Sequence, residues 1–317
     1  MEILSLADVE LRFQIENSVS ELLVAYYEVA RLARQVRLQE ETIDLSKRRL
    51  DQLRTRFSYG QGNSLDILNA EVDLQRDSIN FVTLQQQVKN GRRNLNFLMG
   101  RDVNTPFQVD TVLNLPPLQD LESLLSLMRE NNVQVLLNEK NVDVTEMNFD
   151  IIEASGKPTL SAGAGFDFTY QDNAPGSFIT SSNSRGVTVG LTVNWNLFDG
   201  GLRNVQRQSN QLDLELLSIQ KDQLLAQLER DIVNAWDEYQ TALLVIQAEQ
   251  ANLETNEANY ERTEELYNVG QVTSVEYRQA QLNLLIASTS LNSARYDLKA
   301  IEIRIHLLTG QLMTTGY

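Results

Sequence analysis

The chain contains two copies of one sequence unit, and this repeat limits the possible folds more than any other feature. Residues 59–66, YGQGNSLD, return as residues 269–276, VGQVTSVE, at an offset of 210 residues. Without any gap, the same offset pairs Ala25 with Ala235 and Gly100 with Gly310. Residues 1–100 and 211–310 are therefore copies of one structural unit.

Each copy has the pattern of a long helical hairpin. Apolar residues recur every three or four positions on both sides of a Gly-Gln turn, which is typical of a coiled-coil seam. We expect Tyr26, Trp236 and Tyr239 to pack in this seam. All five prolines lie between residues 106 and 175, so neither copy contains this helix breaker. An arm over 203–267 would be roughly 100 Å long, and it must pack in a bundle within the chain or between subunits.

The middle of the chain has a different period. Residues 160–170 and 187–197 alternate apolar with small or polar side chains, which predicts two strands of about 11 residues joined by a polar loop over 171–185. The pattern fits membrane-facing strands, and it also fits an amphipathic hairpin on a soluble core. Two strands cannot close a barrel, so the membrane interpretation requires several chains to donate strands.

Composition excludes several classes of function. With 27 Lys and Arg against 43 Asp and Glu, the formal charge is −16, so a nucleic acid is a poor partner. Cysteine is absent and His306 is the single histidine, which excludes thiolate chemistry and sites that need two imidazoles. We expect no catalytic residue, no metal, no cofactor and no enzyme activity, and we assign His306 no role. The sequence also lacks an apolar run of transmembrane-helix or signal-peptide length.

Several motifs together resemble the TolC family of outer-membrane efflux proteins. They are the doubled tip motif (59–70 and 267–280), the strand exit NWNLFDGGLR at 194–203, the strand entry at 157–160 and the Leu-x-Gly ends at Gly100 and Gly310. The resemblance implies a mainly α fold, with long antiparallel coiled-coil hairpins that form an α-barrel and an inserted transmembrane β-hairpin.

The resemblance also implies a function. The chain would be an outer-membrane channel subunit of a tripartite efflux or type I secretion system, a passive conduit for small molecules or polypeptides. It would form a homotrimer in outer-membrane lipid of a Gram-negative bacterium, extend into the periplasm, and work with a periplasmic adaptor and an inner-membrane pump. The alternatives are a periplasmic adaptor, which would carry one hairpin rather than two, and a coiled-coil structural protein without a pore, which predicts no lipid-facing strand.

The predicted organisation has six parts: a first helical hairpin at 1–100, a linker at 101–130, a helix at 131–157, the β-hairpin at 158–199, a second helical hairpin at 200–310 and a tail at 311–317. Subunits of the family carry two helix-strand-strand-helix repeats, whereas the first copy here lacks a strand pair. We therefore expect the sequence to be a fragment that lacks about 80 residues and a signal peptide of about 20 residues upstream.

The resemblance assigns candidate functional residues to the hairpin tips. Asp66 and Glu276 would narrow the channel aperture, with Asn69 and Gln279 one turn further on, and a ring of such acids would favour cations. Residues 273–276 (TSVE) also fit a capping box and residues 63–66 (NSLD) resemble one, so both acids also fit a role in closing a helix N-terminus.

The remaining candidates lie at the turns and the strand exit. Adaptor contacts would be made by Gly60, Gln61, Gly270 and Gln271, although both glycines also fit left-handed helix ends. Trp195 and Phe198 would be membrane-interface aromatics, while aromatic residues are common in any strand.

Overall fold

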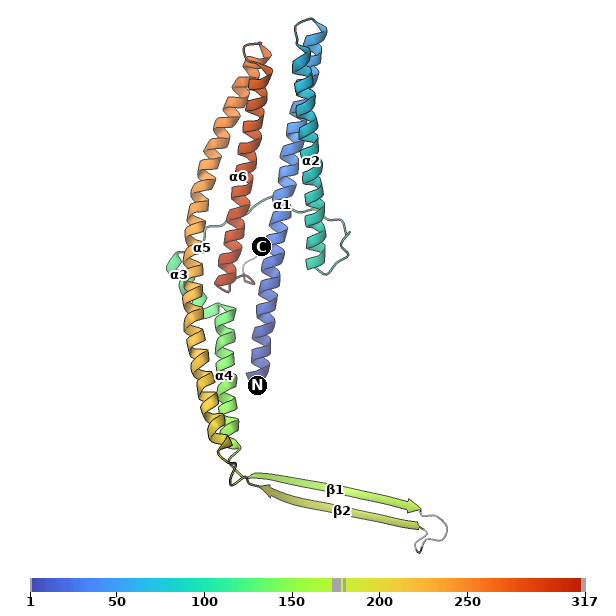
Figure 1. Cartoon of the computed structure of the whole chain (residues 1–317), viewed down its shortest axis with the longest axis vertical. Coiled ribbons are helices and arrows are strands. Elements are labelled where there is room, and N and C mark those ends of the chain that lie inside the picture. Colours follow the sequence, from blue (N-terminus) through green and yellow to red (C-terminus); the bar gives the residue numbers. More distant parts are fainter. Residues whose placement is uncertain (1, 173–177, 179–180, 315–317) are drawn as a thin grey trace. The chain divides into compact units, whose positions relative to one another are not determined.

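The computed structural model describes residues 2–172, 178 and 181–314. In chain order its elements are α1 (Glu2–Ser58), α2 (Ser64–Leu98), α3 (Leu121–Asn131), α4 (Val133–Ala154), β1 (Thr159–Asp172), β2 (Ser181–Asn194), α5 (Leu202–Asn268) and α6 (Ser274–Leu308) (Figure 1). The predicted mainly helical fold with an inserted β-hairpin is confirmed. Among the described residues, no helix combines the length and apolar character needed to cross a membrane.

The chain divides into two compact units. One comprises Met1–Ala7 and Leu137–Gln223, which include most of α4 and both strands. The other comprises Asp8–Leu136 and Leu224–Tyr317, and it holds α2, α3, α6 and most of α1 and α5, including both hairpin tips. The candidate residues at the tips therefore belong to one unit, and those at the strand exit belong to the other.

The two helical hairpins follow the sequence repeat residue by residue. Helices α1 and α5 end at Ser58 and Asn268, while α2 and α6 begin at Ser64 and Ser274, and both pairs differ by the repeat offset. Each turn has a glycine at positive φ, Gly60 at 72° and Gly270 at 76°. The following residues, Gln61 and Gln271, each donate a backbone N–H to the carbonyl five residues earlier at 2.9 Å, as in a Schellman motif. The predicted left-handed helix ends are present at both tips.

In the hairpin unit the helices lie in the order α5, α6, α1, α2 (Figure 1). One apolar cluster joins α5 and α6 with α3, and its fully buried members include Met128, Ile232 and Ile305. A second cluster joins α1 and α2 with the linker around Val29, Val88 and Val109. The predicted seam aromatics take part in these clusters: Tyr239 is buried and stacks on Trp236 at 5.9 Å, and Tyr26 is partly buried in the second cluster.

The β-hairpin is longer than the sequence indicated. β1 and β2 pair antiparallel over 14 residues each, from Thr159↔Asn194 to Asp172↔Ser181, rather than over about 11. Side-chain alternation stops near Tyr170, but backbone pairing continues through polar residues that the sequence pattern assigned to the loop. Residues 173–177, 179 and 180 of that predicted loop, and 315–317 of the predicted tail, lie outside the described residues. Every residue of both strands is exposed.

Candidate functional site at the hairpin tips

The tip of the second hairpin is closed by a capping box. The Thr273 hydroxyl accepts the Glu276 N–H at 3.2 Å, and the Glu276 carboxylate accepts the Thr273 N–H at 2.7 Å and its hydroxyl at 2.8 Å. The backbone hydrogen bond from Thr273, followed by the one from its side chain, lowers the pKa of Glu276. The predicted capping role of Glu276 is therefore confirmed.

The first tip is capped in a different way. Asn63 is the N-cap residue, and its side-chain oxygen accepts the N–H of Leu65 at 3.0 Å. In the part of the chain that the structure describes, the half-buried Asp66 takes no part in a capping box, so the box predicted for Asp66 is wrong. The reason is that the Asn63 oxygen reaches the N–H two residues on, rather than the N–H of Asp66. Asp66 still lies in the first turn of α2, where a carboxylate interacts favourably with the helix dipole.

The structure places the other tip candidates at the surface. Asn69 and Gln279 are exposed one turn beyond the two acids, and Gln279 donates to Asn283 at 2.8 Å. The four turn residues Gly60, Gln61, Gly270 and Gln271 are exposed. Arg56 joins the two tips, because its Nη2 donates to the carbonyls of Tyr267 at 2.9 Å and Asn268 at 3.2 Å.

Three tyrosines pack against one another just below the turn of the second tip. Tyr277 stacks on Tyr267 at 4.6 Å and on Tyr260 at 5.8 Å between ring centroids. The hydroxyls of Tyr260 and Tyr277 lie 3.0 Å apart, and both donate to the Glu264 carboxylate at 2.9 Å. Burial raises the pKa of Tyr260 and of Tyr277, so both phenols stay protonated and available as donors.

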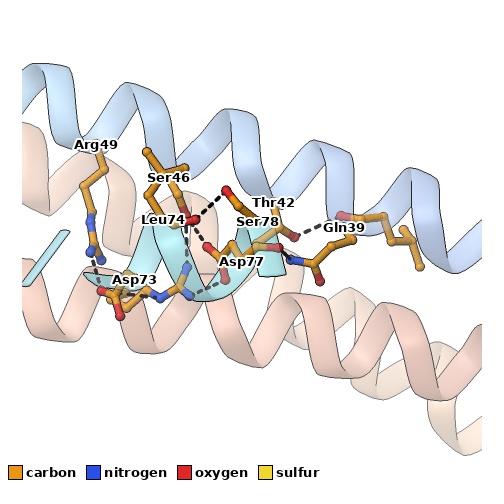
Figure 2. A network of polar contacts seen from close by, with 10 residues as sticks. Gln39, Thr42, Ser46, Arg49, Asp73, Leu74, Asp77 and Ser78 are labelled. Atoms are coloured by element: carbon orange, nitrogen blue, oxygen red, sulfur yellow. Dashed lines mark hydrogen bonds and ion pairs between the residues drawn. The ribbon is translucent and has the colours of Figure 1, made fainter. Parts of the chain in front are cut away.

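A cluster of buried charges, the ionic cluster, joins both hairpins below the tips. Arg278 of α6 donates to Asp77 of α2 at 2.7 Å and to the Ser46 hydroxyl of α1 at 3.1 Å, and Ser46 donates to Asp77 at 2.6 Å. Arg49 donates to Asp73, which also lies 3.7 Å from the Arg278 Nε. Figure 2 shows Ser46, Arg49, Asp73 and Asp77 facing one another between the helices.

This cluster was not predicted from the sequence, because acids and arginines on long helices resemble a solvated face. A signal was nevertheless present in the repeat. The residues 210 positions away are uncharged at all five sites: Asn256, Asn259, Asn283, Ala287 and Leu68. A charge that one copy carries and the other lacks, on an otherwise matching helix, marks a contact specific to that copy.

A second buried polar group surrounds His306, to which the sequence assigned no role. Lys299 and Glu302 form a buried ion pair at 2.9 Å, and the His306 Nε2 lies 3.8 Å from the same carboxylate. Burial lowers the pKa of His306 and raises that of Glu302. The group lies in the C-terminal part of α6, and the Lys299 Nζ also donates to the Asn114 carbonyl of the linker at 3.1 Å.

The predicted interface aromatics lie just beyond β2. Trp195 is 60% exposed and its Nε1 donates to the Gly156 carbonyl at 3.1 Å, while Phe198 is 86% exposed. Both lie in the segment between β2 and α5 rather than within a strand. Their contact with a membrane interface stays a prediction.

Replacing one partner of the ionic cluster should destabilise the hairpin unit. Asp77→Leu leaves Arg278 buried without its closest carboxylate, so we expect a loss of about 3–5 kcal/mol in the free energy of unfolding. The double variant Asp77→Leu/Arg278→Met should recover most of this loss, because neither charge remains buried. Arg54→Ala, which breaks the exposed ion pair with Glu71 between the same α1 and α2, should change stability by about 1 kcal/mol or less. Urea unfolding of the four proteins measures these values, and equal effects of Asp77→Leu and Arg54→Ala would contradict the assignment.

The capping box should make the first turn of α6 sensitive to acid. Because the folded pKa of Glu276 lies below the ordinary value of 4.5, its stabilising contribution is present above that value and is lost as the pH falls through the folded pKa. Hydrogen-exchange protection factors of Tyr277 and its neighbours should therefore fall in acid. The variant Glu276→Gln should lose most of this pH dependence, whereas Glu257→Gln, in the middle of α5, should keep it. An unchanged profile in Glu276→Gln would show that the carboxylate does not close the helix.

Comparisons with known proteins agree with this arrangement. The family described as "Outer membrane efflux protein" matches residues 4–101 and 124–311. The outer membrane efflux protein BepC of Brucella suis is 21% identical over 304 residues, which cover 95% of this chain and 65% of BepC. The outer membrane protein TolC of Escherichia coli is 23% identical over 274 residues, which cover 84% of this chain and 55% of TolC. The chain thus spans less than two thirds of the length of these relatives.

Solved structures share the fold. The CmeC outer membrane channel of Campylobacter jejuni superposes with a TM-score of 0.78 at 14% identity, over 98% of this chain and 66% of CmeC. The outer membrane protein VceC of Vibrio cholerae gives a TM-score of 0.72 at 16% identity, over 96% of this chain and 74% of VceC. The family match includes both helical hairpins and the β-hairpin between them. The resemblance carried by the tip motifs is confirmed, and the chain belongs to the outer membrane efflux protein family, a family of channel proteins.

Proposed function

We propose that this chain is a subunit of an outer-membrane channel that provides a passive export path. The observation that carries the proposal is the β-hairpin, in which every residue of both strands is exposed. An isolated two-stranded hairpin is at best marginally stable in water, so this one requires partners on its edges and cover for its apolar face. Strands from neighbouring subunits and outer-membrane lipid would supply both.

The side chains of the hairpin fit this environment. Phe166 and Val187 are register partners on the apolar face and are 69% and 73% exposed. The opposite face carries Gly165 paired with Thr188, which are small and polar. One lipid-facing and one water-facing side is the pattern of a membrane barrel strand.

The helical unit supports a periplasmic extension of the same conduit. In this proposal three chains assemble as a homotrimer, with the hairpins side by side in an α-barrel and the strands in the outer membrane of a Gram-negative bacterium. In this proposal transport is driven by an inner-membrane pump that is coupled to the channel through a periplasmic adaptor. The exposed turn residues, Gly60 and Gln61 with Gly270 and Gln271, are the surface that would meet the adaptor. Trp195 and Phe198 would lie at the headgroups.

A charge on the apolar strand face tests the membrane role. Val189→Arg should cost about 2–4 kcal/mol of insertion, because arginine would enter the bilayer, whereas Thr188→Arg on the opposite face should be tolerated. Outer-membrane fractionation and drug susceptibility can be measured in a strain that lacks its own exit duct and expresses the cognate adaptor and pump. We expect the gene carrying Val189→Arg to fail in both assays and the gene carrying Thr188→Arg to restore export. Equal behaviour of the two variants would contradict a lipid-facing hairpin.

The acids at the tips would set ion preference. Three copies of Asp66 and Glu276 would place carboxylates around one aperture, and such a ring favours cations. Single-channel recording in a planar bilayer should therefore show lower cation preference for Asp66→Asn/Glu276→Gln than for the unchanged channel. Glu122→Gln, on α3, is the control and should leave the preference unchanged. If the double variant behaves like the control, the two acids act only in folding.

A further inference from the structure

Because the chain contains an internal repeat, a packed surface in one copy predicts an equivalent surface in the other. Within one chain, α6 of the second repeat packs on α1 of the first repeat. Three contacts define this α1·α6 joint: Asn292 Nδ2 donates to the Arg31 carbonyl at 3.2 Å, the Lys299 Nζ lies 5.5 Å from the Tyr27 ring centroid, and Arg278 donates to Ser46 at 3.1 Å. The repeat makes α5 the equivalent of α1 and α2 the equivalent of α6.

Translating these contacts by the repeat offset pairs α2 with α5. Asn292 and Arg31 become Val82 and Thr241, while Lys299 and Tyr27 become Lys89 and Asp237. The second pair changes from a cation over an aromatic ring to a lysine opposite a carboxylate. In one chain α2 and α5 lie at opposite ends of the row of four helices (Figure 1). The α2 that meets this α5 must therefore come from a second chain.

The α2 side of this translated contact is uncovered in the chain. Arg278, Asn292 and Lys299 are buried in the α1·α6 joint, whereas their equivalents on α2 are exposed. Two of these equivalents, Leu68 at 57% and Val82 at 63% exposed, form an apolar stripe at helical spacing together with Ile79, which is 66% exposed. A row of exposed apolar side chains along a long helix is typical of an interaction surface.

The α5 side is uncovered as well, and it has the complementary charge. Asp237, Thr241 and Val245 are exposed, whereas their equivalents on α1 are partly covered by α6. Across the residues that the structure describes, neither Lys89 nor Asp237 has an ion-pair partner. The translated contact would bring these two opposite charges together.

We propose that α2 of one chain packs on α5 of a second, identical chain in the register of the α1·α6 joint, with Lys89 paired to Asp237. The inference rests on the proposed assembly of several chains and specifies its contact. The ionic cluster has no counterpart in this α2·α5 joint, because the equivalents of its residues are Leu68 on α2, Asn256 and Asn259 on α5, and Asn283 and Ala287 on α6. The joint within a chain is thus ionic, and the joint between chains is apolar around one ion pair.

Cross-linking tests the register, and the chain is well suited to it because it contains no cysteine. Val82→Cys combined with Thr241→Cys should give disulfide-linked dimers and trimers on non-reducing gels after mild oxidation. The matched control combines Val82→Cys with Ala248→Cys, which moves one thiol about 10 Å along α5 on the same face. We expect the control to give little cross-linked product. Equal yields from the two pairs would overturn the proposal. So would the absence of product from the first pair in a chain with unchanged helical circular dichroism, which is the result expected if another protein covers the α2 stripe.

Charge reversal tests the ion pair separately from the register. Lys89→Asp or Asp237→Lys alone should weaken association of the chains about two- to fivefold, as expected for one exposed ion pair. The double variant Lys89→Asp/Asp237→Lys restores opposite charges and should recover association. Additive losses in the double variant would overturn the pairing. Sedimentation measures association, and its salt dependence should decrease in each single variant.

The same cysteine pairs separate this inference from the proposed function when they are introduced into the gene and export is followed in cells. If the cells export but the Val82–Thr241 cross-link does not form, the α2·α5 joint is wrong and the channel function is unaffected. If the cross-link forms but cells that contain adaptor and pump do not export, the joint is supported and the channel function is contradicted.

Discussion

The structure depends on one constraint: the apolar face that runs along each long helix must be buried against other helices over its whole length. The long helices α1 and α5 gain most of their stability from the packing of an apolar face rather than from helix propensity. Each long helix therefore returns on itself as a hairpin, and the hairpins pack together around α3 and the linker. The Schellman turns fix where each helix ends, so the seam keeps its register from the tip to the far end.

Much of this architecture could be predicted because the sequence states it twice. The offset located both helical hairpins, and Gly60 and Gly270 located both turns, since only a residue without a side chain takes positive φ at little cost. The strand ends were harder to predict. Alternation of side chains reports which face is apolar, whereas β1 continues to Asp172 through backbone hydrogen bonds that do not depend on alternation.

The polar contacts of the site were the least predictable part. Asp66 and Glu276 occupy equivalent positions, but one cap oxygen belongs to Asn63 and the other to Thr273, and this difference decides which acid joins a capping box. The ionic cluster depends on three helices that approach from distant parts of the chain. Its charges carry no local signal, and only the comparison of the two copies distinguishes Asp77 from a solvated acid. The aperture, adaptor and membrane-interface roles remain predictions from the family resemblance.

The duplication has a consequence for how such an assembly can change over generations. In a ring built from single hairpins, each gene would encode one kind of joint, and any substitution would alter all joints together. Here one chain carries two hairpins whose sequences differ. A mutation at Arg278 touches a contact inside the chain, while a mutation at its counterpart Leu68 touches an outward-facing surface. In the proposed assembly, selection could therefore adjust the contact within a chain and the contact between chains independently.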